Sequence, residues 1–362
     1  MGQVSGSGGR RFAGPARGLR MSIRGAPGRA RRCGSASALA LTIAVLAAMS
    51  AGTSQAATLA SPGPVRHSAV TGGALLAYDA ATRTVVMFAD RQTWTWDGTA
   101  WTQRHPGRTP AARGGASMAY DPATRTVVLF GGKTTVSGPS FDATWTWNGT
   151  AWTEQHPATS PPARHGAGMA YDAATGDIVL FGGKNNGRAG LNGTWTWNGS
   201  NWVEQATETH PPAQVAPSMA YDAATGTVVL FGGVTVRTRD VLNGTWTWNG
   251  SKWTKRAPAS SPPARFASSM ASDAATGTVV LFGGEGGGTV GDRGTLGDTW
   301  TWNGATWTEQ HPATSPAPRR DSAMADDTAT GTVVLFGGYD SQGVGLGDTW
   351  AWNGTTWNQI PG

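Results

Sequence analysis

The stretch Met169–Trp202 reads MAYDAATGDIVLFGGKNNGRAGLNGTWTWNGSNW. It joins four signals in a fixed order: Met-Ala-Tyr-Asp, an apolar run ending in a glycine pair, a Thr-Trp-Thr-Trp alternation, and Asn-Gly before a third tryptophan. This order recurs along the chain. Six aspartates close the first signal, with spacings of 42, 51, 50, 51 and 54 residues: Asp79, Asp121, Asp172, Asp222, Asp273 and Asp327. A recurring period of this size indicates a repeat protein in which each unit is one supersecondary motif.

Each unit predicts four strands, which we name A to D. In the quoted unit, strand A ends at Met169–Asp172, strand B covers Ile178–Gly183, strand C is Thr194–Trp197 and strand D begins at Trp202. The turn between A and B is Asp-Ala-Ala-Thr-Gly, whose last position favours a positive φ and therefore glycine. Units 1 and 2 have arginine there.

The connection between C and D carries Asn-Gly in five units and Asp-Gly in the first. Asn-Gly favours a two-residue type I′ hairpin turn. With Asn148-Gly149 as that turn, we expect Trp147 to face Thr150 and Trp145 to face Trp152. All three indoles of a unit then lie on one face of its sheet.

The 18 tryptophans form six such triplets, and a lone four-stranded sheet would leave its indole face in water. Stacking each sheet on the next buries that face. The sequence therefore predicts an all-β fold, a six-bladed β-propeller of four-stranded antiparallel blades. Gly 53 and Pro 21 agree with such a turn-rich fold.

The four apolar residues before a glycine pair, followed by spaced aromatics, resemble kelch repeats. The resemblance covers residues 72–362, with expected blades at 72–109, 110–160, 161–210, 211–261, 262–315 and 316–362. It implies that strand A lines the central channel and strand D is outermost. Two features depart from the pattern: strand C carries Trp where kelch repeats often have Tyr, and unit 1 has Ala89-Asp90 in place of the glycine pair. How the ring closes is left open, and the short segment 58–71 could add a strand there.

Residues 1–57 have the order of a secretory signal peptide. Eight arginines and no acidic residue precede an apolar run at 38–49, and cleavage is expected after Ala56. The run is short for a membrane span. An uncleaved anchor, a start at Met21 and a twin-arginine signal at Arg31-Arg32 are alternatives. We expect a secreted or cell-surface protein without a stable membrane span after processing.

The leader carries the whole positive charge. Of 28 basic and 22 acidic residues, eight basic ones lie before residue 58, so residues 58–362 hold 20 basic and 22 acidic residues, a net of −2. This balance argues against a nucleic-acid partner. The single cysteine, Cys33, also lies in the leader, so the mature domain has no thiol and depends on its own core.

Candidate binding residues lie on one face. The B–C and D–A connections share that face, and the B–C loops vary from 4 to 16 residues, as is typical of binding loops. Equivalent positions five residues before the strand A methionine could surround the channel mouth and attract an anionic or sugar ligand: Arg113, Arg164, Gln214, Arg265 and Arg319. The alternative is that each side chain bonds to loop carbonyls of its own blade.

Other candidates are weaker. Three histidines occupy equivalent positions at the end of strand D in different units: His105, His156 and His311. We expect them to lie far apart, so they do not predict a metal site. Asn-Gly-Thr/Ser triplets match glycosylation sequons, although the turn already requires Asn-Gly. The repeated aspartates are expected to cap the A–B turn, and Tyr78, Tyr120, Tyr171 and Tyr221 to belong to the core.

The sequence favours a ligand-binding or protein-interaction scaffold, with a protein or glycan as partner and no cofactor. A sugar-active enzyme is the alternative. Among kelch enzymes, galactose oxidase needs a Cys–Tyr cross-link, which a mature chain without cysteine cannot form, so only its fold is implied. Sialic-acid mutarotases are a second group, whose residues cannot be placed on this sequence. The oligomeric state is open.

Overall fold

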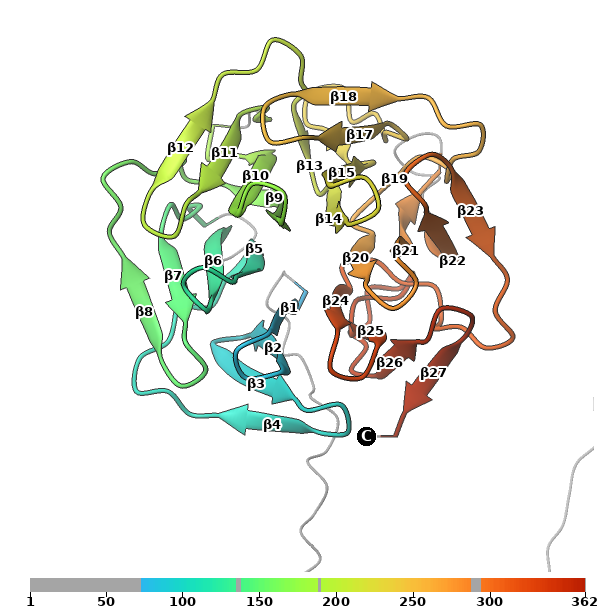
Figure 1. Cartoon of the computed structure of the whole chain (residues 1–362), viewed down its shortest axis with the longest axis horizontal. Helices are drawn as coiled ribbons and strands as arrows, with labels where there is room; N and C mark the ends of the chain where they lie inside the picture. Colours follow the sequence, from blue (N-terminus) through green and yellow to red (C-terminus); the bar gives the residue numbers. More distant parts are fainter. Residues whose placement is uncertain (1–72, 135–137, 188–189, 288–293, 362) are drawn as a thin grey trace, which may run out of the picture. The chain divides into compact units, whose positions relative to one another are not determined.

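Six antiparallel sheets are arranged as blades around a central channel in the computed structural model (Figure 1). The structure describes residues 73–134, 138–187, 190–287 and 294–361. Each sheet contains strands A to D of one repeat in sequence order, with A beside the channel and D at the rim. The predicted all-β six-bladed propeller is thus confirmed.

The strands of blades 1 to 3 are β1 (Leu75–Asp79), β2 (Thr84–Ala89), β3 (Gln92–Trp96), β4 (Trp101–Arg104), β5 (Gly114–Asp121), β6 (Thr126–Lys133), β7 (Thr144–Trp147), β8 (Trp152–Gln155), β9 (His165–Asp172), β10 (Asp177–Lys184), β11 (Thr194–Trp197) and β12 (Trp202–Gln205). Those of blades 4 to 6 are β14 (Ser218–Asp222), β15 (Thr227–Phe231), β17 (Thr245–Trp248), β18 (Trp253–Arg256), β20 (Ser269–Asp273), β21 (Thr278–Gly286), β22 (Gly294–Trp302), β23 (Trp307–Gln310), β24 (Ala323–Asp327), β25 (Thr332–Phe336), β26 (Thr349–Trp352) and β27 (Trp357–Ile360). Of three further short strands, β13 (Gln214–Val215) and β16 (Val234–Thr235) form a separate two-stranded sheet, and β19 (Arg265–Phe266) pairs with β21 in blade 5.

The A–B turns follow the prediction. Their last position has a positive φ in every blade, and Arg83 and Arg125 adopt it at 58° and 57° where the other blades have glycine. The preceding aspartate caps the turn: Asp121 Oδ1 accepts the N–H of Ala123 at 2.9 Å, four equivalent carboxylates make the same bond, and Asp273 instead accepts the N–H of Thr276.

The C–D hairpin differs from the prediction. Trp147 pairs with Trp152, and Trp145 pairs with Glu154, so the loop has four residues rather than two. Only the glycine of this loop has a positive φ. The Asn148 Oδ1 accepts the N–H groups of Thr150 and Ala151 at 3.0 and 2.9 Å, and this side-chain turn replaces the type I′ geometry. The three indoles still share one buried face.

The core lies between neighbouring blades. Apolar residues of strand B are almost fully buried, and each interface packs them against the tryptophans of the following blade. A hydrogen bond recurs between neighbouring blades: the strand D indole Nε1 donates to the Oγ1 of the threonine just before the first strand C tryptophan of the preceding blade. The pairs are Trp152–Thr93, Trp202–Thr144, Trp253–Thr194, Trp307–Thr245 and Trp357–Thr299.

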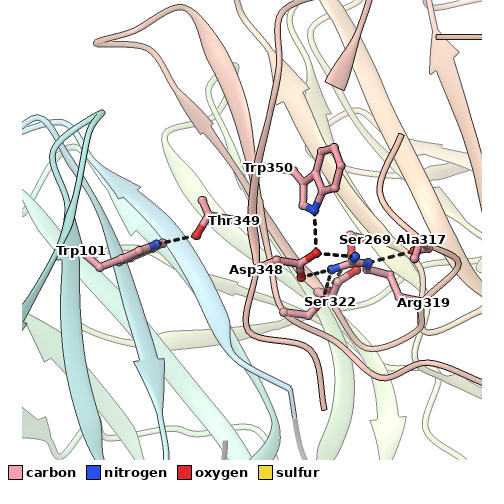
Figure 2. Close-up of polar contacts among 9 residues, drawn as sticks. Trp101, Ser269, Ala317, Arg319, Ser322, Asp348, Thr349 and Trp350 are labelled. Atoms are coloured by element: carbon pink, nitrogen blue, oxygen red, sulfur yellow. Dashed lines mark hydrogen bonds and ion pairs between the residues drawn. The ribbon is translucent and has the colours of Figure 1, made fainter. Parts of the chain in front are cut away.

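The ring closes through the same contact. Trp101 of blade 1 donates to Thr349 Oγ1 of blade 6 at 2.9 Å, as Figure 2 shows, and its ring lies edge-on to Phe336 at 5.4 Å. Both blades complete four strands from their own repeats. Within the described residues, closure therefore uses packing rather than an exchanged strand.

The leader and the segment 58–71 lie outside the described residues. Among the residues that the structure does describe, no helix is long and apolar enough to cross a membrane.

Candidate functional site

The five predicted site residues lie inside the blades. Arg113, Arg164, Arg265 and Arg319 are 6% exposed or less. The Nε of Arg164 donates to the Pro162 carbonyl at 3.1 Å, and its Nη1 donates to the Gly182 carbonyl at 3.0 Å. The other three arginines make the same two contacts in their own blades. Gln214 is 1% exposed, and its amide has no hydrogen-bond partner within the described residues.

Blades 5 and 6 add a carboxylate to this arrangement. Arg319 binds both oxygens of Asp348 at 2.6 and 2.9 Å, and Trp350 Nε1 donates to the same carboxylate at 2.7 Å (Figure 2). Arg265 and Asp298 repeat the pair in blade 5. Burial opposes ionisation of Asp298, but the hydrogen bonds and charge of Arg265 outweigh it and lower the pKa of the carboxyl.

These contacts favour the alternative in which each arginine bonds to carbonyls of its own blade. Burial lowers the pKa of Arg164 to about 10, so the guanidinium remains charged at neutral pH. Ligand binding by the five residues stays a prediction.

A different set of residues lines the mouth of the channel on the face of the B–C and D–A loops. A cavity of about 560 Å³ opens there, which we call the loop-face cavity. Part of its lining is a collar of equivalent positions, each two residues after one of the five predicted site residues: Gly115, Gly166, Ala216, Ala267 and Asp321. All five have φ between 52° and 65°.

The collar is hydrogen-bonded from blade to blade. The N–H of Ala216 donates to the Gly166 carbonyl at 2.8 Å, that of Ala267 to Ala216 at 3.0 Å, and that of Asp321 to Ala267 at 2.9 Å. A non-glycine residue with left-handed φ is strained, and such strain is often found at functional sites. Asp321 is the one collar residue among these five with a charged side chain.

The cavity has walls of opposite charge. On the side of blades 2 and 3 lie Lys133 and His165, with Lys184 paired to His165 in the sheet. On the opposite side, Arg320 binds Asp321 at 2.7 Å and Glu285 at 3.4 Å, and its guanidinium lies 5.6 Å from the centre of the Tyr339 ring. Three basic and two acidic side chains thus lie around the mouth, and burial raises the pKa of Asp321 although Arg320 opposes this effect.

The His165 imidazole in this site is uncharged at neutral pH. Burial, with smaller effects of Lys133 and Lys184, lowers its pKa to about 4. The Ser140 hydroxyl lies 2.8 Å from Nδ1 and fixes the ring. Burial also lowers the pKa of Lys133, with Lys184 adding to the effect.

This shift predicts a pH dependence of stability. The unfolded chain binds a proton on His165 below pH 6.5, whereas the folded chain resists it until about pH 4, so stability falls as the pH drops between these values. After solvent screening we expect a loss of about 1 to 2 kcal/mol. Urea unfolding of the wild type and His165→Gln at a series of pH values measures it. The variant should lose less stability than the wild type across this range, and parallel profiles would contradict the assignment.

The remaining sequence candidates do not assemble a site. His105, His156 and His311 are exposed at the ends of strand D in blades 1, 2 and 5. Within the described residues, no cluster of three or more His, Cys, Asp or Glu side chains is arranged to hold a metal. The sequon asparagines use their side chains in the C–D turns.

Comparison with known proteins supports the fold alone. No family model matches the chain, and no curated protein matches its sequence. Among solved structures, "Structure of YjhT" is similar with a TM-score of 0.62 and 15% identity, covering 82% of this chain and 99% of that one. The chain is a β-propeller.

Proposed function

We propose that the protein is an exported kelch-type propeller that binds a small acidic glycan, or the acidic end of a longer one, in the loop-face cavity. The observation that carries the proposal is the cavity of about 560 Å³ with charged walls at the channel mouth. A cavity of this volume suits a small ligand better than a protein partner, which would bind through a flatter surface. The glycine pairs and spaced aromatics of the repeats support kelch-type blades.

The chemistry of the walls matches such a ligand. Lys133 and Arg320 can hold a carboxylate, because cationic donors make the strongest hydrogen bonds to carboxylates. Asp321, Ser268 and Ser322 can accept or share hydrogen bonds with sugar hydroxyls. Tyr339 lies in a variable B–C loop and Lys133 ends β6 where another such loop begins, and these loops are the natural place for specificity.

A glycan array probed with the secreted protein tests this proposal. We expect acidic glycans to be retained over their neutral counterparts. Calorimetry on the best ligand should show roughly tenfold weaker binding, about 1.4 kcal/mol, for Lys133→Ala and for Arg320→Ala. Lys255→Ala removes an exposed charge on strand β18, at the rim of the propeller, and should bind as the wild type does. Equal retention of neutral glycans, or equal losses in all three variants, would contradict the proposal.

Export is a separate part of the proposal. We expect the mature protein to begin at Ala57, and an intact mass of the secreted protein measures this. A secreted chain that retains residues 1–56 would contradict cleavage at this site.

A further inference from the structure

A second cavity lies at the other end of the channel. It encloses about 450 Å³ beside the A–B turns, and we call it the turn-face cavity. Strand A of every blade contributes to it at one register position, just before the turn aspartate. The six residues at that position are Tyr78, Tyr120, Tyr171, Tyr221, Ser272 and Asp326.

The tyrosines give this cavity an aromatic wall. They are half-buried, and they pack against the cores between the blades while also lining the cavity. The sequence assigned them to the core, which accounts for only part of their surroundings. Burial raises the pKa of Tyr120, Tyr171 and Tyr221, and the nearest turn aspartates add to the effect, so the hydroxyls stay neutral. Further in, methionines and a leucine line the cavity: Leu76, Met118, Met169, Met219, Met270 and Met324.

Asp326 gives the cavity an acidic side chain. One carboxylate oxygen accepts the N–H of Ala274 at 3.3 Å, and no ion pair to Asp326 occurs among the described residues. Its strand packs between β1 and β20, whose titratable groups near it are Tyr78, Asp79 and Asp273, with Asp327 beside it on β24. None of these groups is basic. Burial raises the pKa of Asp326 to about 7, and Asp273 and Asp327 add to the effect.

We propose that the turn-face cavity binds an organic ammonium ion, with the positive charge against Asp326 and the carbon substituents against the tyrosines and methionines. Aromatic faces attract ammonium groups, and aromatic cages recognise quaternary ammonium ligands. A hard metal ion needs six or more oxygen ligands, whereas only two carboxylates among the described residues, those of Asp326 and Asp273, line this otherwise largely apolar cavity. The site is independent of the loop-face cavity, because it lies at the opposite end of the channel.

The repeats themselves provide variants that suit this backbone position. Asp326→Ser introduces the residue of blade 5, and Tyr171→Ser does the same in the aromatic wall. Asp177→Ser is the matched control, because Asp177 adjoins an A–B turn at the start of strand B and does not line the cavity. Thermal unfolding of each variant confirms that it is folded.

Calorimetric titration with choline tests the proposal, and 3,3-dimethyl-1-butanol serves as a neutral probe of the same shape. We expect saturable choline binding, and roughly tenfold weaker binding of the alcohol. Asp326→Ser should lose choline binding by about the same factor, Tyr171→Ser should weaken it, and Asp177→Ser should leave it unchanged. Equal binding of the two probes, no choline binding, or full binding by Asp326→Ser would overturn the proposal.

Discussion

Replacing Arg265 with alanine is expected to lower the free energy of unfolding by about 3 to 5 kcal/mol. The Arg265 side chain is fully buried, and it donates to the Pro263 and Gly283 carbonyls and to both oxygens of Asp298. Alanine leaves the Asp298 carboxylate and the Gly283 carbonyl without these partners, and a half-buried charge that loses its partner is costly. Urea unfolding followed by tryptophan fluorescence measures the change.

Arg164→Ala is the matched comparison. Arg164 makes the same two backbone contacts but binds no carboxylate among the described residues, so we expect a smaller loss of about 1 to 3 kcal/mol. A second comparison is Arg265→Ala in an Asp298→Ala background, where the loss should shrink because no carboxylate remains unpaired. If Arg265→Ala kept its stability and lost glycan binding instead, the ligand role first predicted for this ring would hold.

Trp101→Ala is expected to lower the free energy of unfolding by about 3 to 5 kcal/mol and to weaken the junction between blades 1 and 6 first. Its indole packs against Phe336 and Trp96 and donates to Thr349, so alanine leaves a cavity and an unpaired hydroxyl where the ring closes. Hydrogen exchange followed by mass spectrometry should show faster exchange in β1, β4 and β26.

Trp101→Phe separates the hydrogen bond from the packing. It keeps an aromatic ring beside Phe336 but cannot donate to Thr349, so a loss of about 1 to 2 kcal/mol is expected. If Trp101→Ala showed the same hydrogen-exchange rates in all six blades, closure of the propeller would not depend on this contact.

The sequence predicted the fold well because the fold is local and repeated. Period-two patterning placed the tryptophans on one face, and Asp121 and its equivalents cap their turns as expected. The C–D register was wrong because the Asn148 side chain can form its own turn, which competes with the two-residue hairpin. Ring closure was not predictable, because Trp101 and Thr349 meet only after six blades have been placed.

The candidate site was harder to predict, because its residues come from different blades and meet only in the folded ring. Arg113 and its equivalents occupy the same position in each repeat. The direction of each side chain, however, is set by its hydrogen bond to a glycine carbonyl near the end of strand B, which the sequence does not show. Lys133 ends strand β6 and Arg320 lies in the connection before β24, so the two converge only around the channel. A usable signal was present, since functional positions depart from the repeat: Asp321 replaces glycine or alanine, and Asp326 replaces tyrosine.

Chemical-shift mapping of the ¹⁵N-labelled mature protein, titrated with the best acidic glycan from the array, tests the central claim most directly. We predict that the largest shifts fall on Lys133, His165, Ser268 and Asp321 around the loop-face cavity. Shifts confined to the outer strands D or to the A–B turns would contradict a ligand site at this mouth of the channel.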